Sequence, residues 1–305
     1  MTSYENMPEC FSRNKNGKKT KMNQKGQDLL QNIKQSKEHG SVDYLAPFID
    51  EFNSCFGDSV QIGQSTRPCG DRTVALIYRS YDSPYRDRDF WELVFGGICS
   101  IEADDGVDTD DIQLPTDFLK NIGYISGNVN LCGNGDKYEP STYLKEINGN
   151  VRFIDFKFET ITLVDGFVHG HGDLDFIGCN IDKIAPTVTT LGNIGLNTSY
   201  ISGLASLQAP VGFINSMELY NSTISQLNVG HIDKTLKVMR STIQMLKYGE
   251  IPLVILSRSH LDSINDLEQH DGEYELDDHS EICGAIVSPG VYTAWELMDE
   301  INMLL

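Results

Sequence analysis

The sequence predicts a mainly β protein whose middle part winds as a parallel β-solenoid, preceded by a small α+β N-terminal unit and followed by a C-terminal cap. Two observations support this fold class. Apolar residues recur at the same four offsets in six copies, which begin 23, 20, 23, 19 and 18 residues apart. The first two of these offsets alternate with polar residues, as they do in a short β-strand.

The repeat is clearest in GDLDFIGCNIDKI, which begins at Gly172. Leu174, Phe176, Ile181 and Ile184 stand two, four, nine and twelve residues after this glycine. One coil cannot bury its own apolar side, but stacked coils bury a continuous column, so we expect successive first strands to form a parallel ladder. The residues predicted to lie side by side at the second offset are Val151, Leu174, Ile194, Met217, Leu236 and Val254. Those predicted at the twelfth offset are Ile161, Ile184, Leu204, Leu227, Leu246 and Ile264.

Composition divides the chain into four parts. Residues 1–25 are rich in Lys, Asn and Gly and are expected to form a flexible basic arm, and residues 26–110 a small α+β unit. The repeats occupy residues 120–266, and residues 267–305 form an acidic segment and cap. The cap is needed because the apolar end of the last coil would otherwise be exposed.

Within these flanking parts, apolar spacing predicts individual elements. Helices are expected over 27–37 and in YLAPFIDEF (44–52), a buried strand in VALIYRSY (74–81), and one or two strands in FWELVFGGICSIEA (90–103). The C-terminal run is amphipathic and is expected to cover the last coil with Trp295, Leu297, Met298, Ile301 and Leu305.

The pattern L-x-L-x-x-(N/C)-x-L-x-x-L, seen as LDFIGCNIDKI, resembles the core of a leucine-rich repeat. Cys179 stands where that family has Asn or Cys, a residue whose side chain satisfies buried backbone groups at the turn. A serine hydroxyl can do this in part, whereas Phe156 cannot. The short returns leave little room for long helices, so the chain resembles an irregular leucine-rich-repeat or β-solenoid protein of bacterial or phage type. The other copies place these residues in the slot: Phe156, Ser199, Ser222, Ser241 and Ser259.

The formal net charge of −20 favours a basic partner and disfavours nucleic acid or an anionic membrane surface. The charge is unevenly spread, since residues 1–38 carry eight Lys or Arg against four acids, and the chain from Ser259 onward carries twelve acids and no Lys or Arg. Self-association through the basic arm and the acidic tail is therefore one alternative. Seven scattered cysteines, with no apolar signal core at the N-terminus, predict reduced thiols and a location in a bacterial or host-cell cytoplasm.

Residues at offsets one, three and five are expected to project outward from the first strands and to form a binding face. An apolar stripe bordered by charge is typical of a protein-binding surface. The alternative is that the fifth offset faces inward at a turn. The candidate residues are Arg152, Ile154, Asp173, Asp175, Ile177, Glu218, Tyr220, Lys237 and Met239.

Asp173 and Asp175, with Glu218 on a neighbouring coil, also invite a carboxylate-dependent reaction on a glycoside, because paired acids can serve as general acid and base. Solvated surface charges are the simpler interpretation. His169 and His171 are two residues apart and could hold a metal with Asp173, although two histidines at a glycine-rich turn are more often simply turn residues. We therefore predict no catalytic residue, no metal and no cofactor.

The preferred interpretation is a non-enzymatic protein-binding solenoid that presents its strand face to a protein partner. One variant is an inhibitor that imitates the charge of nucleic acid and so blocks a nucleic-acid-binding enzyme. The alternatives are a β-helix enzyme acting on glycosides and a structural or assembly component of a phage particle.

Overall fold

The computed structural model describes residues 11–13, 19–79, 87–109, 114, 118–163, 173–186, 191–197, 199–207, 214–264, 267 and 271–305. It divides into two compact units, residues 1–132 and 133–305. Among the described residues, no helix combines the length and the apolar character that a membrane crossing requires.

The first unit is small and mixed. Its helices are α1 (Gln24–Glu38), η1 (Ala46–Phe48), α2 (Ile49–Phe56), α3 (Arg88–Gly97) and η2 (Phe118–Asn121). Its strands are β1 (Phe11–Arg13), β2 (Lys19–Met22), β3 (Val60–Gln64), β4 (Val74–Arg79), β5 (Ser100–Asp108) and the start of β6 (Tyr124–Leu144). β1 pairs with β2 and β3 with β4 in antiparallel fashion, whereas β4, β5 and β6 follow one another in parallel.

The expectation that FWELVFGGICSIEA forms only strands is wrong, because its first half is the helix α3. Asp87 caps this helix by accepting a hydrogen bond from the Asp89 amide, at 2.8 Å. Phe90, Trp91, Val94 and Phe95 have helical spacing and are buried, so an aromatic-rich run that favours strands locally is held as a helix by packing. Cys55 forms a disulfide, so the expectation of reduced thiols throughout is also wrong.

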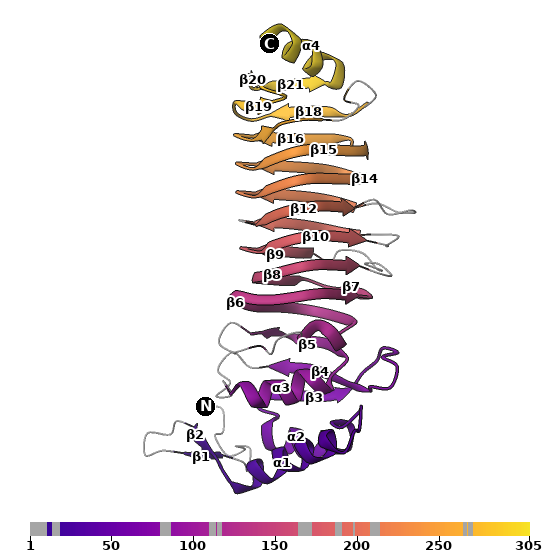
Figure 1. Cartoon of the computed structure of the whole chain (residues 1–305), viewed down its shortest axis with the longest axis vertical. Coiled ribbons are helices and arrows are strands. Elements are labelled where there is room, and N and C mark those ends of the chain that lie inside the picture. The colour runs from indigo at the N-terminus through magenta and orange to yellow at the C-terminus, as the bar shows by residue number, and fades with distance from the viewer. Residues whose placement is uncertain are drawn as a thin grey trace, which may run out of the picture. The chain divides into compact units, whose positions relative to one another are not determined.

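The second unit is a parallel β-solenoid of about seven turns, as the repeat predicted (Figure 1). Its strands build two parallel ladders, and the single strand β14 takes part in both. The first ladder contains the beginning of β8 (Val151–Leu163), β9 (Asp173–Ile177), β11 (Leu191–Asn197), β13 (Ile214–Tyr220), the end of β14 (Thr223–Met239), β16 (Leu253–Ser257) and β18 (Glu273–Leu276). The second contains the end of β8, β10 (Asn180–Pro186), β12 (Tyr200–Leu207), the beginning of β14, β15 (Thr242–Glu250), β17 (His260–Leu261) and β19 (Ser280–Ile282). β7 (Glu146–Asn148) precedes both.

The register confirms that the second-offset residues lie side by side. Val151 pairs with Leu174, Leu174 with Ile194, and Ile194 with Met217, and all four side chains are buried. One predicted position is wrong: Ala205, not Leu204, pairs with Ile184 and Leu227. The register shifts between Ile201 and Leu204, so this coil carries one additional residue before the position that pairs with Ile184 and Leu227.

A corner with a similar backbone geometry joins the two strands in five of the coils. The residue at offset six has a positive φ, at Asp155, Gly178, Asn221, Arg240 and Arg258. The following residue is the slot identified in the sequence, and its side chain hydrogen-bonds the backbone of neighbouring coils. We call this column of residues the corner ladder: Cys179, Ser199, Ser222, Ser241, Ser259 and Ser280.

The corner ladder links coil to coil through buried hydrogen bonds. The amide of Ser199 donates to the hydroxyl of Ser222 at 3.2 Å, and the amide of Ser222 donates to that of Ser241 at 3.0 Å. The Ser222 hydroxyl also lies 2.9 Å from the carbonyl oxygen of Leu196 and 3.0 Å from that of Tyr220. Serine thus satisfies buried backbone groups at the turn, as the resemblance implied.

Phe156 occupies the slot in the first coil and packs instead of hydrogen-bonding. Its ring lies 5.3 Å from that of Phe158 and 5.9 Å from that of Phe153, and Phe153 stacks on Phe176 of the next coil at 5.6 Å. This aromatic cluster fills the solenoid interior where the corner ladder is absent.

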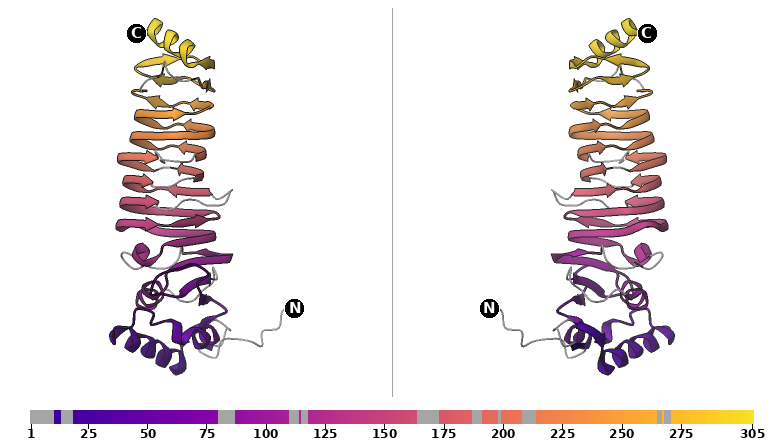
Figure 2. Two further views of the ribbon diagram at one scale, coloured as in Figure 1. Left: turned by 90° about the vertical axis from the view of Figure 1, so that its right-hand side faces the viewer. Right: turned by 90° about the vertical axis from the view of Figure 1, so that its left-hand side faces the viewer.

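The parallel pairing continues past residue 266. Tyr274 in β18 pairs with Val254, and Ile282 in β19 pairs with Leu261, which completes a further coil. β20 (Ala285–Val287) and β21 (Gly290–Thr293) then fold back in antiparallel fashion, and α4 (Ala294–Leu304) packs against them. In the two side views of Figure 2, α4 lies beyond the last strands of this unit.

Candidate binding face

The outer side of the first ladder carries three rows of residues that are in register from coil to coil. The middle row, at offset three, contains Arg152, Asp175, Gly195, Glu218, Lys237, Ile255 and Glu275. The edge row, at offset five, contains Ile154, Ile177, Asn197, Tyr220, Met239 and Ser257. The remaining row, at offset one, contains Asp173, Asn193, Ser216, Thr235, Leu253 and Glu273.

The side chains of the edge row are partly accessible. Ile154, Ile177, Tyr220 and Met239 are half-buried, in contrast to the fully buried inward residues that alternate with them. The row therefore offers a low apolar ridge along one side of the face, interrupted by Asn197.

The charges of the middle row are paired with one another. Arg152 Nε lies 3.2 Å from Asp175 Oδ2, and Lys237 Nζ lies 3.8 Å from Glu218 Oε1. All four side chains are partly exposed, so each pair contributes at most about 1 kcal/mol to stability. The pairs do, however, fix the order of charges along the stack. The first pair runs from positive Arg152 to negative Asp175, and the second, after Gly195, from negative Glu218 to positive Lys237.

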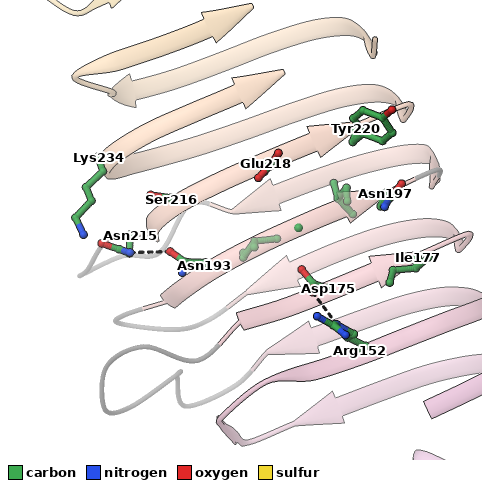
Figure 3. Close-up of a pocket in the computed structure, with 13 residues that line it drawn as sticks. Arg152, Asp175, Ile177, Asn193, Asn197, Asn215, Ser216, Glu218, Tyr220 and Lys234 are labelled. Carbon is green, nitrogen blue, oxygen red and sulfur yellow. Dashed lines mark hydrogen bonds and ion pairs between the residues drawn. The ribbon is translucent and has the colours of Figure 1, made fainter. Parts of the chain in front are cut away.

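Gly195 separates the two pairs and opens a depression of about 710 Å³ in the face. A Cβ atom at this position would lie 2.2 Å from Asp175 Oδ1, so the aspartate carboxylate extends over the glycine. Figure 3 shows Ile177, Asn197 and Tyr220 along one side of the depression and Asn193, Asn215 and Lys234 along the other. The side-chain Nδ2 of Asn215 donates to Asn193 Oδ1 at 2.6 Å.

A second, smaller depression of about 380 Å³ adjoins the other side of Tyr220 and also includes Met239. Arg240 holds the tyrosine in place, because its Nη1 donates to the phenol oxygen at 3.2 Å and its guanidinium lies 5.9 Å from the ring centroid. Beyond it, Arg258 donates to Asp278 at 2.5 Å. Tyr220 is thus fixed between two hollows.

The structure brings most of the predicted face residues together. Five of them line the larger depression: Arg152, Asp175, Ile177, Glu218 and Tyr220. Lys237 pairs with Glu218, Met239 lines the smaller depression, and Ile154 extends the edge row by one coil. Asp173 pairs in backbone register with Asn193, but its side chain lies outside the described part of the structure.

Sequence reasoning missed Asn215, Lys234 and Arg240 as members of the site. Asn215 and Lys234 are the residues from which two copies were counted, and Arg240 stands at the corner, so none of them belongs to the outward offsets. One signal in the sequence could have identified Arg240. Offset six is a polar residue or glycine in successive copies, which marks the corner next to the edge row.

Other candidate chemistry receives no support from the described residues. His169 and His171 lie outside them. Within the part of the chain that is described, no three His, Cys, Asp or Glu side chains gather closely enough to hold a metal ion. Burial raises the pKa of the Cys99 thiol to about 12 and that of Cys179 to about 11, which keeps both protonated near neutral pH and poorly nucleophilic.

In comparisons with known proteins, no family model, no curated protein and no solved structure matches this chain.

Proposed function

We propose that the protein is a non-enzymatic binding protein that presents the outer side of its first ladder to a protein partner. The observation that carries this proposal is the position of Tyr220, which Arg240 fixes between two depressions, next to Met239 in the edge row. Tyrosine, arginine and methionine are enriched at protein interfaces, where a few fixed aromatic and arginine side chains supply most of the binding energy.

The charges of the middle row support recognition of a protein with a complementary charge order. Because Asp175 and Glu218 flank Gly195, a basic side chain of a partner could enter the larger depression between them, with Ile177 and Tyr220 contacting its aliphatic part. Such contacts fix the register of a partner on the face more than they add affinity.

Three finer points belong to this proposal. We infer an irregular leucine-rich-repeat protein of bacterial or phage type, a description supported by the L-x-L-x-x-(N/C)-x-L-x-x-L pattern and the slot residues. We infer a cytoplasmic location, which five free cysteines among those described support and the Cys55 disulfide opposes, and which cell fractionation tests. The net charge of −20 supports the inhibitor variant, in which partner binding weakens steeply as salt rises.

The matched variants Met239→Asp and Met245→Asp test the binding face. Met239 lies in the edge row of the first ladder, whereas Met245 is exposed on β15 in the second ladder, so the two changes are chemically identical on different sides of the solenoid. Proteins captured from the native host by the wild type should be lost with Met239→Asp and retained with Met245→Asp. Equal loss or equal retention in the two variants would contradict this face.

One observation favours a second candidate, a carboxylate-dependent glycoside hydrolase. Asp175 and Glu218 stand two rungs apart, about 10 Å between Cα atoms, on either side of the larger depression. Inverting glycosidases hold their two carboxyl groups about 6.5–9.5 Å apart. Against this candidate, both carboxylates are already engaged, since Asp175 is paired with Arg152 and Glu218 with Lys237. Turnover of a glycan by the purified protein, abolished by Asp175→Asn, would favour the enzyme.

A further inference from the structure

The helix α4 closes the solenoid with one side and leaves the other side uncovered by the described residues. Its N-terminus is fixed by a capping box, in which the Thr293 amide donates to Glu296 Oε2 at 2.8 Å and the Glu296 amide donates to the Thr293 hydroxyl at 3.3 Å. Ala294, Leu297 and Ile301 are buried beneath the helix. On the opposite side, Trp295 is 58% exposed and Met303 is 74% exposed.

Trp295, Asp299 and Met303 follow one another at intervals of four residues, so they line one side of the helix. We call this the outer side of α4. The three buried residues already cover the last coil. Capping alone therefore does not explain why two large apolar side chains are exposed on the outer side of the helix.

The segment of the chain that carries this surface has a strong excess of acidic residues, although Asp278 is paired with Arg258. Val291, which is 66% exposed just before α4, pairs with Glu275 in β18. From Ser259 to Leu305 the chain has twelve Asp or Glu and no Lys or Arg. The same end of a second copy would bring like charges together, so this surface fits a basic segment that also carries apolar residues.

The chain contains one segment of this kind. Residues 1–25 hold six Lys or Arg against two Glu, together with Met7, Phe11 and Met22. We propose that the outer side of α4 in one copy binds residues 1–25 of a second copy, so that the copies associate head to tail. Two different surfaces meet in this contact, so it is heterologous and extends into open chains of copies.

The experiment measures the mass of the full-length protein in solution by sedimentation at increasing concentration. At about 50 mM salt the mean mass should rise with concentration beyond that of a dimer, and it should return toward that of a monomer at about 500 mM salt, because the contact pairs opposite charges. The variant Trp295→Asp should weaken association at least about tenfold, as expected for an aromatic residue at the centre of a contact, whereas Met245→Asp on the side of the solenoid should leave it unchanged.

Mixing two defective variants gives the sharpest test. Trp295→Asp disables the outer side of α4, and a variant with Lys15, Lys18, Lys19 and Lys21 replaced by Glu disables the basic segment. Each should be monomeric alone, and their equimolar mixture should form a dimer that grows no further. A wild type that stays monomeric at every concentration, which includes the case of binding within one copy, overturns the proposal, as does a mixture that remains monomeric. These readouts are independent of the first-ladder face, which Met239→Asp tests separately.

Discussion

Replacing Ser222 by alanine should destabilise the solenoid far more than removing a serine hydroxyl at its surface would. The Ser222 side chain is buried, accepts a hydrogen bond from the Ser199 amide at 3.2 Å and lies 2.9 Å from the Leu196 carbonyl oxygen. In Ser222→Ala the Ser199 N–H is left in the protein interior without its acceptor, and a carbonyl loses its donor. A buried group left unsatisfied costs about 1–3 kcal/mol, so we expect a loss of about 2–3 kcal/mol in the free energy of unfolding.

Urea unfolding followed by far-ultraviolet circular dichroism measures this loss. With a slope of about 2 kcal/mol per molar urea, the midpoint of the transition should fall by about 1 M. Ser216→Ala is the matched control, since Ser216 lies half-buried on the outer side of β13, six residues before Ser222. Ser222→Cys should recover part of the loss, because Cys179 occupies the equivalent slot and its thiol donates to the Phe153 carbonyl at 3.2 Å. Equal midpoints for Ser222→Ala and Ser216→Ala would refute the role given to the corner ladder.

Three further outcomes follow from the interior and from the first unit. Tyr274→Phe should raise the free energy of unfolding by about 1 kcal/mol, because the buried phenol oxygen has no hydrogen-bond partner among the described residues; a lower urea midpoint would contradict this. Phe176→Ala should cost about 3–5 kcal/mol in the same assay, since it removes the ring that stacks on Phe153, and a loss below about 1 kcal/mol would mean that the cluster does not support the first coils. Burial opposes ionisation of Glu102, but hydrogen bonds from Thr66, Ser65 and Ser100 hold its pKa below the ordinary value of 4.5. Its contribution is therefore complete above that value and is lost as the pH falls through the lower folded-state pKa, so Glu102→Gln should flatten the acid side of a stability–pH curve, and an unchanged curve would exclude this carboxylate as a source of acid sensitivity.

The solenoid could be predicted from the sequence because its core is periodic along the chain. Every coil must place apolar side chains at equivalent inward positions, and the residues that do so, such as Leu174 and Ile181, recur with short and similar spacings. The pattern failed where a coil gains a residue. Ala205 replaces Leu204 in the ladder for this reason, and Ile282 stands ten residues after Gly272 where Leu261 stands nine after Pro252, so the last coil was not recognised.

The candidate site was less predictable, because its main features depend on neighbours in space. The larger depression exists because a glycine, Gly195, falls in register between Asp175 and Glu218, which are 20 residues before it and 23 after it. Arg240 reaches Tyr220 from the next coil, and no spacing within one repeat encodes that contact. The helix α3 was missed for a related reason, since burial of Phe90 and Trp91 in the first unit, rather than local propensity, decides its conformation.

The corner ladder also has a direction. Its hydrogen bonds run from the amide of one coil to the side chain of the coil that follows, as from Cys179 to Ser199, from Ser199 to Ser222 and from Ser259 to Ser280. During synthesis, each of these corner amides can therefore form its hydrogen bond only after the next coil has been synthesised. Excision of one complete coil would join two equivalent corners and preserve the column, whereas a cut after any coil would strand a buried amide. Duplication or loss of a whole repeat could therefore change the number of coils without changing the type of contact between neighbouring coils.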